Sequence, residues 1–271
     1  MELNKKIFTL VGMSGCGKTT LSQKLANEGF FHYSIDYEIA HTHLQKHICQ
    51  YVIEKIKNQS DYFKELHEKF AIKLELSLTF DDLALITMFV IPENKNGKVP
   101  LGKFLENQQF YKQAEYLATK EFYKKAQIAF EYYNSLGFVN DATGSICEVV
   151  LEDLEMLKLI REKSCLVWIK TDESHNDLLV ERSKEKVKPI LYNYNFLMQN
   201  LADFYKKKKF SDDFEIDKQF FIEIFPKLLT FRKQNYERLV EKTNGLIVHA
   251  NEIEKIKNLN DFLGIIYEKN C

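Results

Sequence analysis

The chain has 271 residues, of which 45% are hydrophobic and 28% are charged, and its formal net charge at pH 7 is -1. This composition supports a full hydrophobic core in one large domain, or in one domain with a big insertion. Because the charges balance, the chain has no general basic field, and we expect no general binding to nucleic acid. No apolar run approaches the length of a membrane span, so we expect no membrane partner.

The cysteines and the N-terminus point to the cellular compartment. We expect reduced thiols instead of a disulfide or zinc framework, because the cysteines are scattered without a C-x-x-C pair. The N-terminus leads directly into a predicted strand, without the pattern of a secretory signal peptide. These features predict a cytoplasmic protein and leave its oligomeric state open. The five cysteines are Cys16, Cys49, Cys147, Cys165 and Cys271.

The strongest signal is the segment 12–20, Gly-Met-Ser-Gly-Cys-Gly-Lys-Thr-Thr, which fits the pattern G-x-x-x-x-G-K-[ST]. The apolar run Ile7–Val11 predicts a strand before it, and the pattern Leu21–Ala26 predicts a helix behind it. Glycines let backbone N–H groups turn inward onto phosphate oxygens, and the helix N-terminus adds positive potential. The sequence therefore predicts a phosphate-binding loop (P-loop) that uses Gly12, Ser14, Gly15, Cys16, Gly17, Lys18, Thr19 and Thr20.

Two side chains of this loop have expected roles. Lys18 is expected to contact the β- and γ-phosphates of a nucleotide, and the Thr19 hydroxyl to ligate Mg²⁺. The sequence shows no N-K-x-D-type guanine signature, which favours ATP over GTP. We therefore expect ATP and Mg²⁺ as cofactors. The alternative is a vestigial loop in a protein that no longer binds nucleotide.

Short apolar runs bounded by turn residues predict five strands with helical patterns between them. This alternation is typical of an α/β fold, a three-layer sandwich with a parallel sheet between helices. About a hundred residues separate the second strand from the third, far more than one crossover helix needs. We therefore expect a helical insertion over residues 41–135. The strands are Lys6–Val11, Phe30–Ile35, Phe138–Asn140, Leu166–Lys170 and Leu246–His249.

The insertion itself reads as helical. Its last segment is rich in aromatic residues, and their helical spacing is more typical of a hydrophobic core than of a base-stacking surface. Near its start, His41, His43 and His47 lie close in sequence, and the last two share a helix face on which a metal could bind. No cysteine or carboxylate completes such a site, so solvated or stacked histidines are favoured. The helical segments are Tyr51–Lys57, Tyr62–Leu78, Asp82–Phe89 and Leu101–Tyr133.

Three further segments resemble a P-loop small-molecule kinase of the shikimate kinase and nucleoside-monophosphate kinase type. Residues 34–39, Ser-Ile-Asp-Tyr-Glu-Ile, resemble the Asp-x-Asp-x-Glu-Ile stretch of shikimate kinases, with Ser34 in place of the first Asp. Arg182 and the Lys-Pro-Ile-Leu of 188–191 resemble the Arg…Arg-Pro-Leu-Leu lid, with lysine as the second basic residue. Residues 232–236 resemble the Arg-x-x-x-Tyr helix before the last strand. The resemblance covers about residues 1–40 and 136–268.

The resemblance implies one P-loop kinase-like domain over residues 1–271, with strand order 2-3-1-4-5 and a mobile lid over residues 181–215. It also implies that Asp36 holds the acceptor hydroxyl and takes its proton, and that Arg182 stabilises charge on the transferred phosphoryl group. Phosphoryl transfer needs such cations, because negative charge spreads over the transferred group. The alternatives are that Asp36 caps the next helix and that Arg182 forms a solvated ion pair with Glu181 or Glu185.

The third strand leads into Asp141, which lies where a P-loop protein holds Mg²⁺ directly or through water. Because Ser34 cannot supply the charge of the first Asp of the family, Asp141 is the preferred compensating carboxylate. Thr143-Gly144-Ser145 follow it and open a helix predicted over 146–161. Either this helix N-terminus binds an anion or a hydroxyl, or Thr143 or Ser145 simply caps it.

The sequence therefore predicts an ATP-dependent kinase of a small molecule, nucleoside or nucleotide, with Lys18, Asp36, Arg182 and Lys188 around the transferred phosphate. The acceptor is expected under the insertion, which contains no arginine. Arginines clamp carboxylate substrates, so a neutral acceptor such as a base or a sugar is favoured over shikimate. One alternative is an ATP-switched binding protein that uses the insertion as partner surface. Another is a polynucleotide or RNA-end kinase that stacks bases on the aromatic residues.

Overall fold

A parallel sheet of five strands forms the middle layer of the fold, in a computed structural model that describes residues 6–69, 72, 84–185 and 191–269. The strands lie in the order β2-β4-β1-β5-β7. Counted along the chain without the short β3 and β6, this order is 2-3-1-4-5, so the predicted fold class is confirmed. The strands are β1 (Lys6–Val11), β2 (Phe30–Ser34), β4 (Gly137–Asp141), β5 (Cys165–Lys170) and β7 (Leu246–His249).

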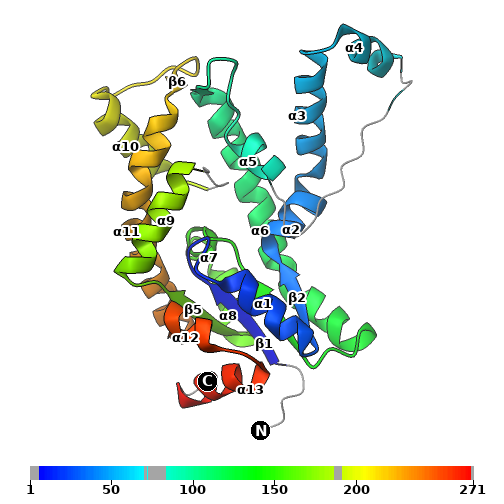
Figure 1. Ribbon diagram of the computed structural model, residues 1–271, viewed down its shortest axis with the longest axis vertical. Helices are drawn as coiled ribbons and strands as arrows, with labels where there is room; N and C mark the ends of the chain where they lie inside the picture. The colour runs from blue at the N-terminus through cyan, green and yellow to red at the C-terminus, as the bar shows by residue number, and fades with distance from the viewer. Residues whose placement is uncertain (1–5, 70–71, 73–83, 186–190, 270–271) are drawn as a thin grey trace.

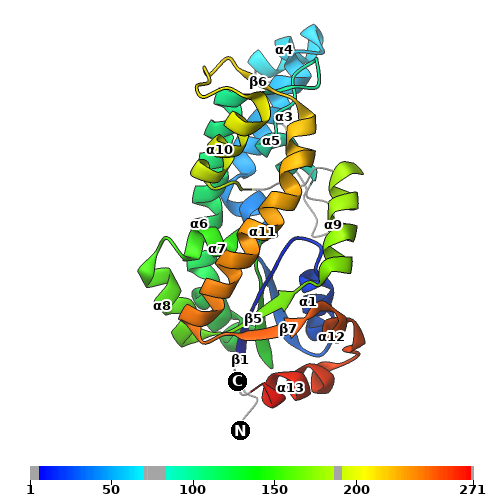
Figure 2. The same ribbon diagram turned by 90° about the vertical axis from the view of Figure 1, so that its left-hand side faces the viewer.

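Helices cover both faces of the sheet because its side chains alternate between two apolar surfaces. Phe8 and Leu10 of β1 pack with Leu21 and Leu25 of α1 (Lys18–Asn27) in one hydrophobic cluster. On the other face, Phe138 of β4 belongs to a larger cluster that includes the long helices of the chain. Figure 2 shows α6, α7, α8 and α11 on one side of the sheet and α1 with α12 on the other.

The described part of the interval between β2 and β4 is mainly helical. Its longest helix is α6 (Leu101–Tyr132), whose 32 residues extend about 48 Å. Phe104, Tyr111 and Phe122 of this helix are buried, which agrees with the expectation that its aromatic residues belong to a hydrophobic core. The second half of the predicted helix 62–78 lies outside the described residues. The other helices here are α2 (Ile35–Glu38), the π-helix η1 (Ile39–His43), α3 (Gln45–Lys57), α4 (Asp61–Glu68) and α5 (Ala84–Val90).

A short antiparallel pair of strands joins this interval to the C-terminal half of the chain (Figure 1). Strand β3 (Val99–Pro100) precedes α6, and β6 (Glu215–Ile216) precedes α11 (Lys218–Thr243). The Leu101 N–H also donates to the carbonyl oxygen of Phe214 at 2.8 Å. Neither strand is predicted from the sequence, because two residues are too few to show an alternating pattern. The pair ties the start of α6 to the start of α11.

The helix predicted over 146–161 is two helices, α7 (Ile146–Val150) and α8 (Leu154–Lys163). Asp153 starts the second one, because its carboxylate accepts the backbone N–H groups of Glu155 and Met156. No helix in the described parts of the chain is both long and apolar enough to cross a membrane. The remaining helices are α9 (Glu173–Glu185), α10 (Tyr194–Tyr205), α12 (Ala250–Lys255) and α13 (Leu259–Glu268).

The cysteines differ from the sequence expectation at one position. Cys16 and Cys147 are buried free thiols. Cys165, at the start of β5, is disulfide-bonded. The expectation that all five cysteines are reduced is therefore wrong for Cys165, since scattered spacing in the sequence does not exclude a pair that the fold brings together.

The packing at the start of β4 gives a stability test. A Cβ at Gly137 would overlap the buried ring of Phe30, so Gly137→Ala is expected to destabilise the protein by about 1–3 kcal/mol. Gly264→Ala on the exposed side of α13 is the control, because no described atom lies within 4 Å of its Cβ. We expect this control to be neutral or to stabilise by about 0.5–1 kcal/mol. Urea unfolding of both variants measures the difference, and equal midpoints would contradict the packing of β2 on β4.

Candidate active site

The loop between β1 and α1 has the backbone geometry of a phosphate-binding loop. Gly12, Gly15 and Gly17 have φ angles of 147°, 91° and 100°, which residues with a Cβ rarely adopt. Gly12 is also confined by space, since a Cβ there would come within 2.8 Å of the carbonyl oxygen of Ile169 on β5. The loop therefore depends on its glycines for both conformation and close packing.

Lys18 is held inside this loop. Its side chain is 6% exposed, and Nζ donates to the carbonyl oxygens of Gly12 at 2.8 Å and Met13 at 3.1 Å. Thr19 and Thr20 follow it in the exposed first turn of α1. A fixed ammonium group and a helix N-terminus thus lie at one loop, an arrangement that favours the binding of a polyphosphate.

Asp141 lies at the carboxyl end of β4, next to the end of β1. The residue is 4% exposed, and its Oδ2 lies 3.2 Å from Nε2 of His32 on β2. Its carboxylate is close to the P-loop: burial raises the pKa of the Cys16 thiol, and the charge of Asp141 adds to this rise. The adjacent strand end thus contributes a carboxylate beside the loop that carries Lys18. His32 was not predicted from the sequence, because its contact with Asp141 depends on strand pairing.

Asp36 is half-buried in the short helix α2, at the end of β2. Its Oδ1 accepts a hydrogen bond from Tyr111 Oη of α6 at 3.4 Å. The capping role considered for Asp36 is carried by Ser34, whose Oγ accepts the backbone N–H of Tyr37 at 3.3 Å. The Asp36 carboxylate is therefore directed to α6 instead of to the start of its own helix.

Arg182 comes to the same loop from α9. Its Nη1 lies 4.0 Å from the position of a Cβ built on Gly15. Glu181, considered as its ion-pair partner, instead binds Lys184 at 2.5 Å. The side chain of Glu185, the other partner considered, and Lys188 both lie outside the described residues.

A cavity of about 220 Å³ lies between the P-loop and α9 on one side and α12 on the other. Gly15, Gly17 and Arg182 line it together with Ala250 of α12. His175 of α9 connects its two sides, since Nε2 lies 3.2 Å from Oε1 of Glu254. The P-loop thus opens into a cavity bounded by the two helices that follow β5 and β7.

Glu115 of α6 is a site residue that the sequence analysis missed. It is fully buried, and its carboxylate accepts hydrogen bonds from the hydroxyls of Thr143 and Ser145. Burial raises the pKa of Glu115 to about 7, and the nearby Asp36 charge adds to the rise. Neither hydroxyl caps α7, so the capping alternative for Thr143 and Ser145 is wrong.

The loop that carries Thr143 and Ser145 also packs on the P-loop. A Cβ at Gly144 would lie 3.0 Å from the backbone nitrogen of Ser14 and 3.5 Å from Nη1 of Arg232. Arg232 of α11 is 2% exposed, and its Nε lies 2.7 Å from Oε1 of Glu148 on α7. Residues 232–236 lie in α11, the helix before the last strand, as the resemblance implies. Through Arg232, this helix packs against the loop that carries Thr143 and Ser145.

Two of the three histidines at the start of the insertion are stacked on aromatic rings, whereas Nε2 of His43 lies 3.8 Å from Oε2 of Glu121. His41 stacks on Tyr37 with a centroid distance of 5.2 Å, and His47 stacks on Phe110 at 4.2 Å. Among the described residues, no group of three or more His, Cys, Asp or Glu side chains could hold a metal ion.

Comparisons with known proteins give the class of fold. A model of the NB-ARC domain matches residues 1–83. Among solved structures, the chain is similar to shikimate kinase from Bacteroides thetaiotaomicron, with 12% identity, a TM-score of 0.39 and 97% of each chain covered. It is also similar to shikimate kinase from Acinetobacter baumannii, with 13% identity, a TM-score of 0.47, and 98% of this chain and 95% of that one covered. No curated protein matches the chain.

The sheet order and the loop between β1 and α1 define a P-loop fold. The two shikimate kinases are 12% and 13% identical to the chain, so what the site can do chemically follows from its own geometry.

The buried carboxyl group of Glu115 predicts a pH-dependent stability. Burial raises its pKa to about 7 in the folded protein from an ordinary value of 4.5, so its contribution to folding stability is fully present below pH 4.5 and is lost as pH rises through 7. The loss amounts to about 3 kcal/mol at most. Glu115→Gln keeps an acceptor for the two hydroxyls and does not titrate. We expect the variant to gain stability relative to wild type between pH 4.5 and 7.5, measured by urea unfolding, and a constant difference would contradict a neutral buried Glu115.

Proposed function

We propose that this chain is an ATP-dependent phosphotransferase that transfers the γ-phosphoryl group to a small-molecule acceptor. The observation that supports this proposal is that groups from three elements converge on one loop. Lys18 belongs to the loop, Arg182 reaches it from α9, and Asp141 lies beside it at the end of β4. Two cations and a carboxylate around a polyphosphate are what phosphoryl transfer requires, because catalysis is mostly positioning and charge neutralisation.

In this proposal the nucleotide binds with its phosphates at the P-loop and its base toward α9 and α12. Its phosphates bind the P-loop and the first turn of α1, and its base enters the cavity of about 220 Å³ between α9 and α12. The Thr19 hydroxyl and the Asp141 carboxylate would hold Mg²⁺, since both are oxygen ligands of the kind that it prefers. Bound there, Mg²⁺ would neutralise phosphate charge.

The acceptor binds on the side of α6, against Asp36. The Asp36 carboxylate accepts the hydrogen bond of the acceptor hydroxyl and takes its proton as the oxygen attacks the γ-phosphorus, while the bond from the γ-phosphorus to the β,γ-bridging oxygen breaks and ADP leaves. Arg182 stabilises the negative charge on the transferred group. Asp36 and Glu115 make this side acidic, and Arg232 is already paired with Glu148. A neutral acceptor, such as a nucleoside or a sugar, therefore suits it better than a carboxylate.

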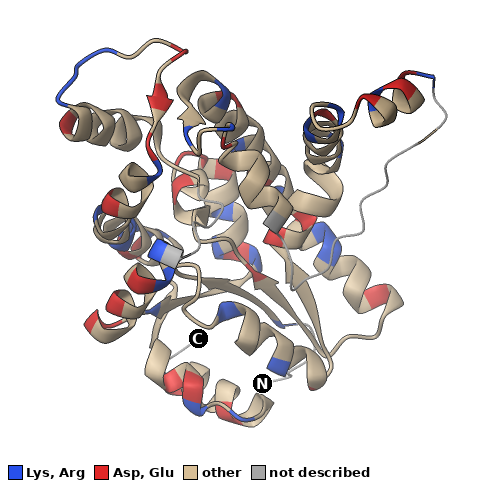
Figure 3. Ribbon diagram, turned by 45° about the horizontal axis from the view of Figure 1, so that its top comes forward, with Lys and Arg blue, Asp and Glu red and all other residues tan. Residues whose placement is uncertain are grey.

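A nucleotide-switched binding protein is the second candidate. The observation that favours it is the β3–β6 pair, which couples the insertion to the chain that follows the lid region. A polynucleotide-end kinase has less support, since Phe104, Tyr111 and Phe122 are buried and not available for base stacking. Figure 3 shows basic and acidic residues interspersed along most of the helices, with one continuous basic stretch in the loop after α10, Lys206–Lys209.

Nucleotide binding is tested first by thermal stabilisation with Mg·ATP, Mg·ADP and Mg·GTP. A ligand at a hundredfold excess over its Kd stabilises the native state by about 2.7 kcal/mol. We expect Mg·ATP to raise the Tm of wild type, and Lys18→Ala to lose most of this rise. Lys158→Ala removes an exposed lysine of α8 and should respond as wild type does. A wild type that no nucleotide stabilises would refute the proposed function.

The chemical role of Asp36 is tested with Asp36→Asn, which keeps the size of the side chain but cannot take a proton. We expect this variant to retain the Tm rise with Mg·ATP and to lose acceptor-dependent ADP release by about 10²–10⁴-fold. Asp203→Asn on α10 is the control, since Asp203 only binds Gln199 at the surface. The assay measures ADP release with each member of a panel of neutral nucleosides and sugars as the acceptor. If no acceptor stimulates ADP release but nucleotide changes the protease sensitivity of residues 41–69, the switch is favoured instead.

A further inference from the structure

The cavity beside the P-loop has two apolar walls that belong to separate parts of the chain. Leu178 and Leu179 come from α9, and Ala250 and Ile253 come from α12. Leu178 is 55% exposed, so apolar surface is free to contact a ligand. The volume of about 220 Å³ is below the roughly 300–1,000 Å³ of a pocket for a whole small molecule, so the cavity suits one flat ring system.

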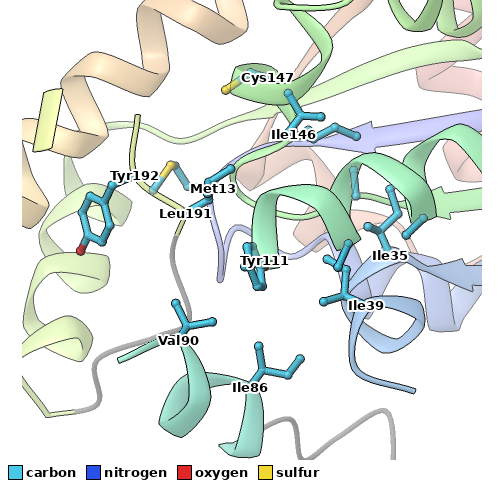
Figure 4. Packing of buried hydrophobic residues seen from close by; sticks show 14 of the residues in the cluster. Met13, Ile35, Ile39, Ile86, Val90, Tyr111, Ile146, Cys147, Leu191 and Tyr192 are labelled. Carbon is cyan, nitrogen blue, oxygen red and sulfur yellow. The ribbon is translucent and has the colours of Figure 1, made fainter. Parts of the chain in front are cut away.

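The P-loop lies between the hydrophobic core and this cavity. Met13 is 6% exposed and belongs to the larger hydrophobic cluster, shown from close by in Figure 4, whereas Gly15 and Gly17 line the cavity. Helix α12 follows β7, the strand at the edge of the sheet. Lys24 of α1 holds the end of α12, since Nζ donates to the carbonyl oxygen of Ile256 at 2.7 Å. The distance between α12 and α9 then depends on contacts across the cavity.

His175 makes a polar contact of this kind. It lines the cavity from α9, and its Nε2 lies 3.2 Å from Oε1 of Glu254, which lines the cavity from α12. On the other side of the ring, Nδ1 lies 3.0 Å from Oδ1 of Asp172. Asp172 is itself fixed, since the same oxygen accepts the backbone N–H of His175 and the hydroxyl of Ser174 at 2.9 and 2.8 Å. The imidazole is thus anchored at the start of α9 and directed to α12.

The two contacts of the ring require an imidazolium cation. Carboxylates only accept hydrogen bonds, and a neutral imidazole donates from one nitrogen alone, so only the cation donates to Asp172 and Glu254 together. Hydrogen bonds, first of all that of the His175 backbone N–H, lower the pKa of Asp172 to about 2 and keep it ionised. The hydrogen bond to Asp172 raises the pKa of His175 above its ordinary value of 6.5. Partial burial opposes this rise in the pKa, and the hydrogen bond to Glu254 adds to it.

The sign of the pH dependence follows from this rise. The contact of the cation with both carboxylates is present below pH 6.5 and is lost as the pH rises through the raised pKa of His175. The other charged side chains that line the cavity are Lys24 and Arg182. Among the side chains of this lining, imidazole is the type whose charge ordinarily changes between pH 5 and 8. The polar contact between the walls is therefore set by the protonation of one ring.

We propose that His175 is a positioning residue of the nucleotide site, which in its cationic form joins α9 to α12 and so holds the two walls of the base cavity together. Mg·ATP then binds more tightly to the protein with a charged ring than to the protein with a neutral one. A cation beside the P-loop acts in the same direction, because it attracts the phosphates. This role rests on the proposed function, since it concerns the cavity assigned there to the base.

The contact itself is tested in the protein without nucleotide. Ring resonances of His175 in NMR spectra give its titration in wild type and in Glu254→Gln. We expect His175 of the variant to titrate at a pH about 0.2–0.7 lower, a modest change because the side chain of Glu254 is 70% exposed and water screens the pair. His67 of α4, whose ring contacts Phe63 of the same helix, is the internal control and should titrate alike in both proteins. An unchanged titration of His175 would overturn the proposal.

The effect on nucleotide is tested by calorimetric titration with Mg·ATP at about pH 6 and about pH 8.5, on either side of the His175 titration. His175→Gln keeps a polar side chain without a charge, and comparison with wild type at the same pH cancels the ionisation of the nucleotide. We expect the Kd of His175→Gln to be about 2- to 5-fold above that of wild type at the lower pH, and the two to agree within about 1.5-fold at the higher pH. His67→Gln should bind as wild type does at both.

The outcomes separate this role from the proposed function. A ratio of the two Kd values that does not change with pH, or tighter binding by His175→Gln at the lower pH, would overturn the role of His175 while nucleotide binding stands. Absence of Mg·ATP binding to wild type at both pH values would instead refute the proposed function and this role together.

Discussion

The buried guanidinium of Arg232 is the interaction on which the packing around the candidate site depends. It binds Glu148 of α7 and the carbonyl oxygen of Leu191, and it lies beside Gly144, which packs on Ser14 of the P-loop. A charge in this position is stable only while its partners are present, because an unpaired buried charge costs about 3–5 kcal/mol. One side chain of α11 thus fixes the helix after β4, the segment before α10 and the wall of the phosphate-binding loop.

How much could be read from the sequence depends on the range of the interactions. The P-loop was predicted correctly from glycines, a lysine and an apolar run that lie within a few residues of one another, whereas the correct strand order came from the resemblance to P-loop kinases. Glu115 was missed, since in sequence it is one polar residue of a long aromatic helix, and only the fold brings it to Thr143. Ser34 was interpreted as a lost carboxylate, whereas its side chain starts α2. A buried polar cluster depends on the tertiary structure, whereas the cap of Ser34 on Tyr37 is a local contact.

The carboxylates near the acceptor side differ in their surroundings. Asp36 is half-buried and bound to Tyr111, whereas Glu115 is fully buried, and the charge of Asp36 opposes ionisation of Glu115. With its pKa raised to about 7, Glu115 titrates near physiological pH, and the hydroxyls of Thr143 and Ser145 that donate to it are sensitive to its charge. The loop that packs on the P-loop thus contains a group that responds to the charge of whatever binds beside it.

The pairing of β3 with β6 has a mechanical consequence. It fastens the N-terminal ends of the two longest helices to each other, far from the sheet on which their C-terminal halves rest (Figure 1). Tyr111 and Glu115 lie on one of these helices and Arg232 lies on the other. Because the two helices are joined at their N-terminal ends and packed on the sheet at their C-terminal halves, a tilt of one helix is transmitted to the other. Closure over a bound substrate would therefore displace both sides together.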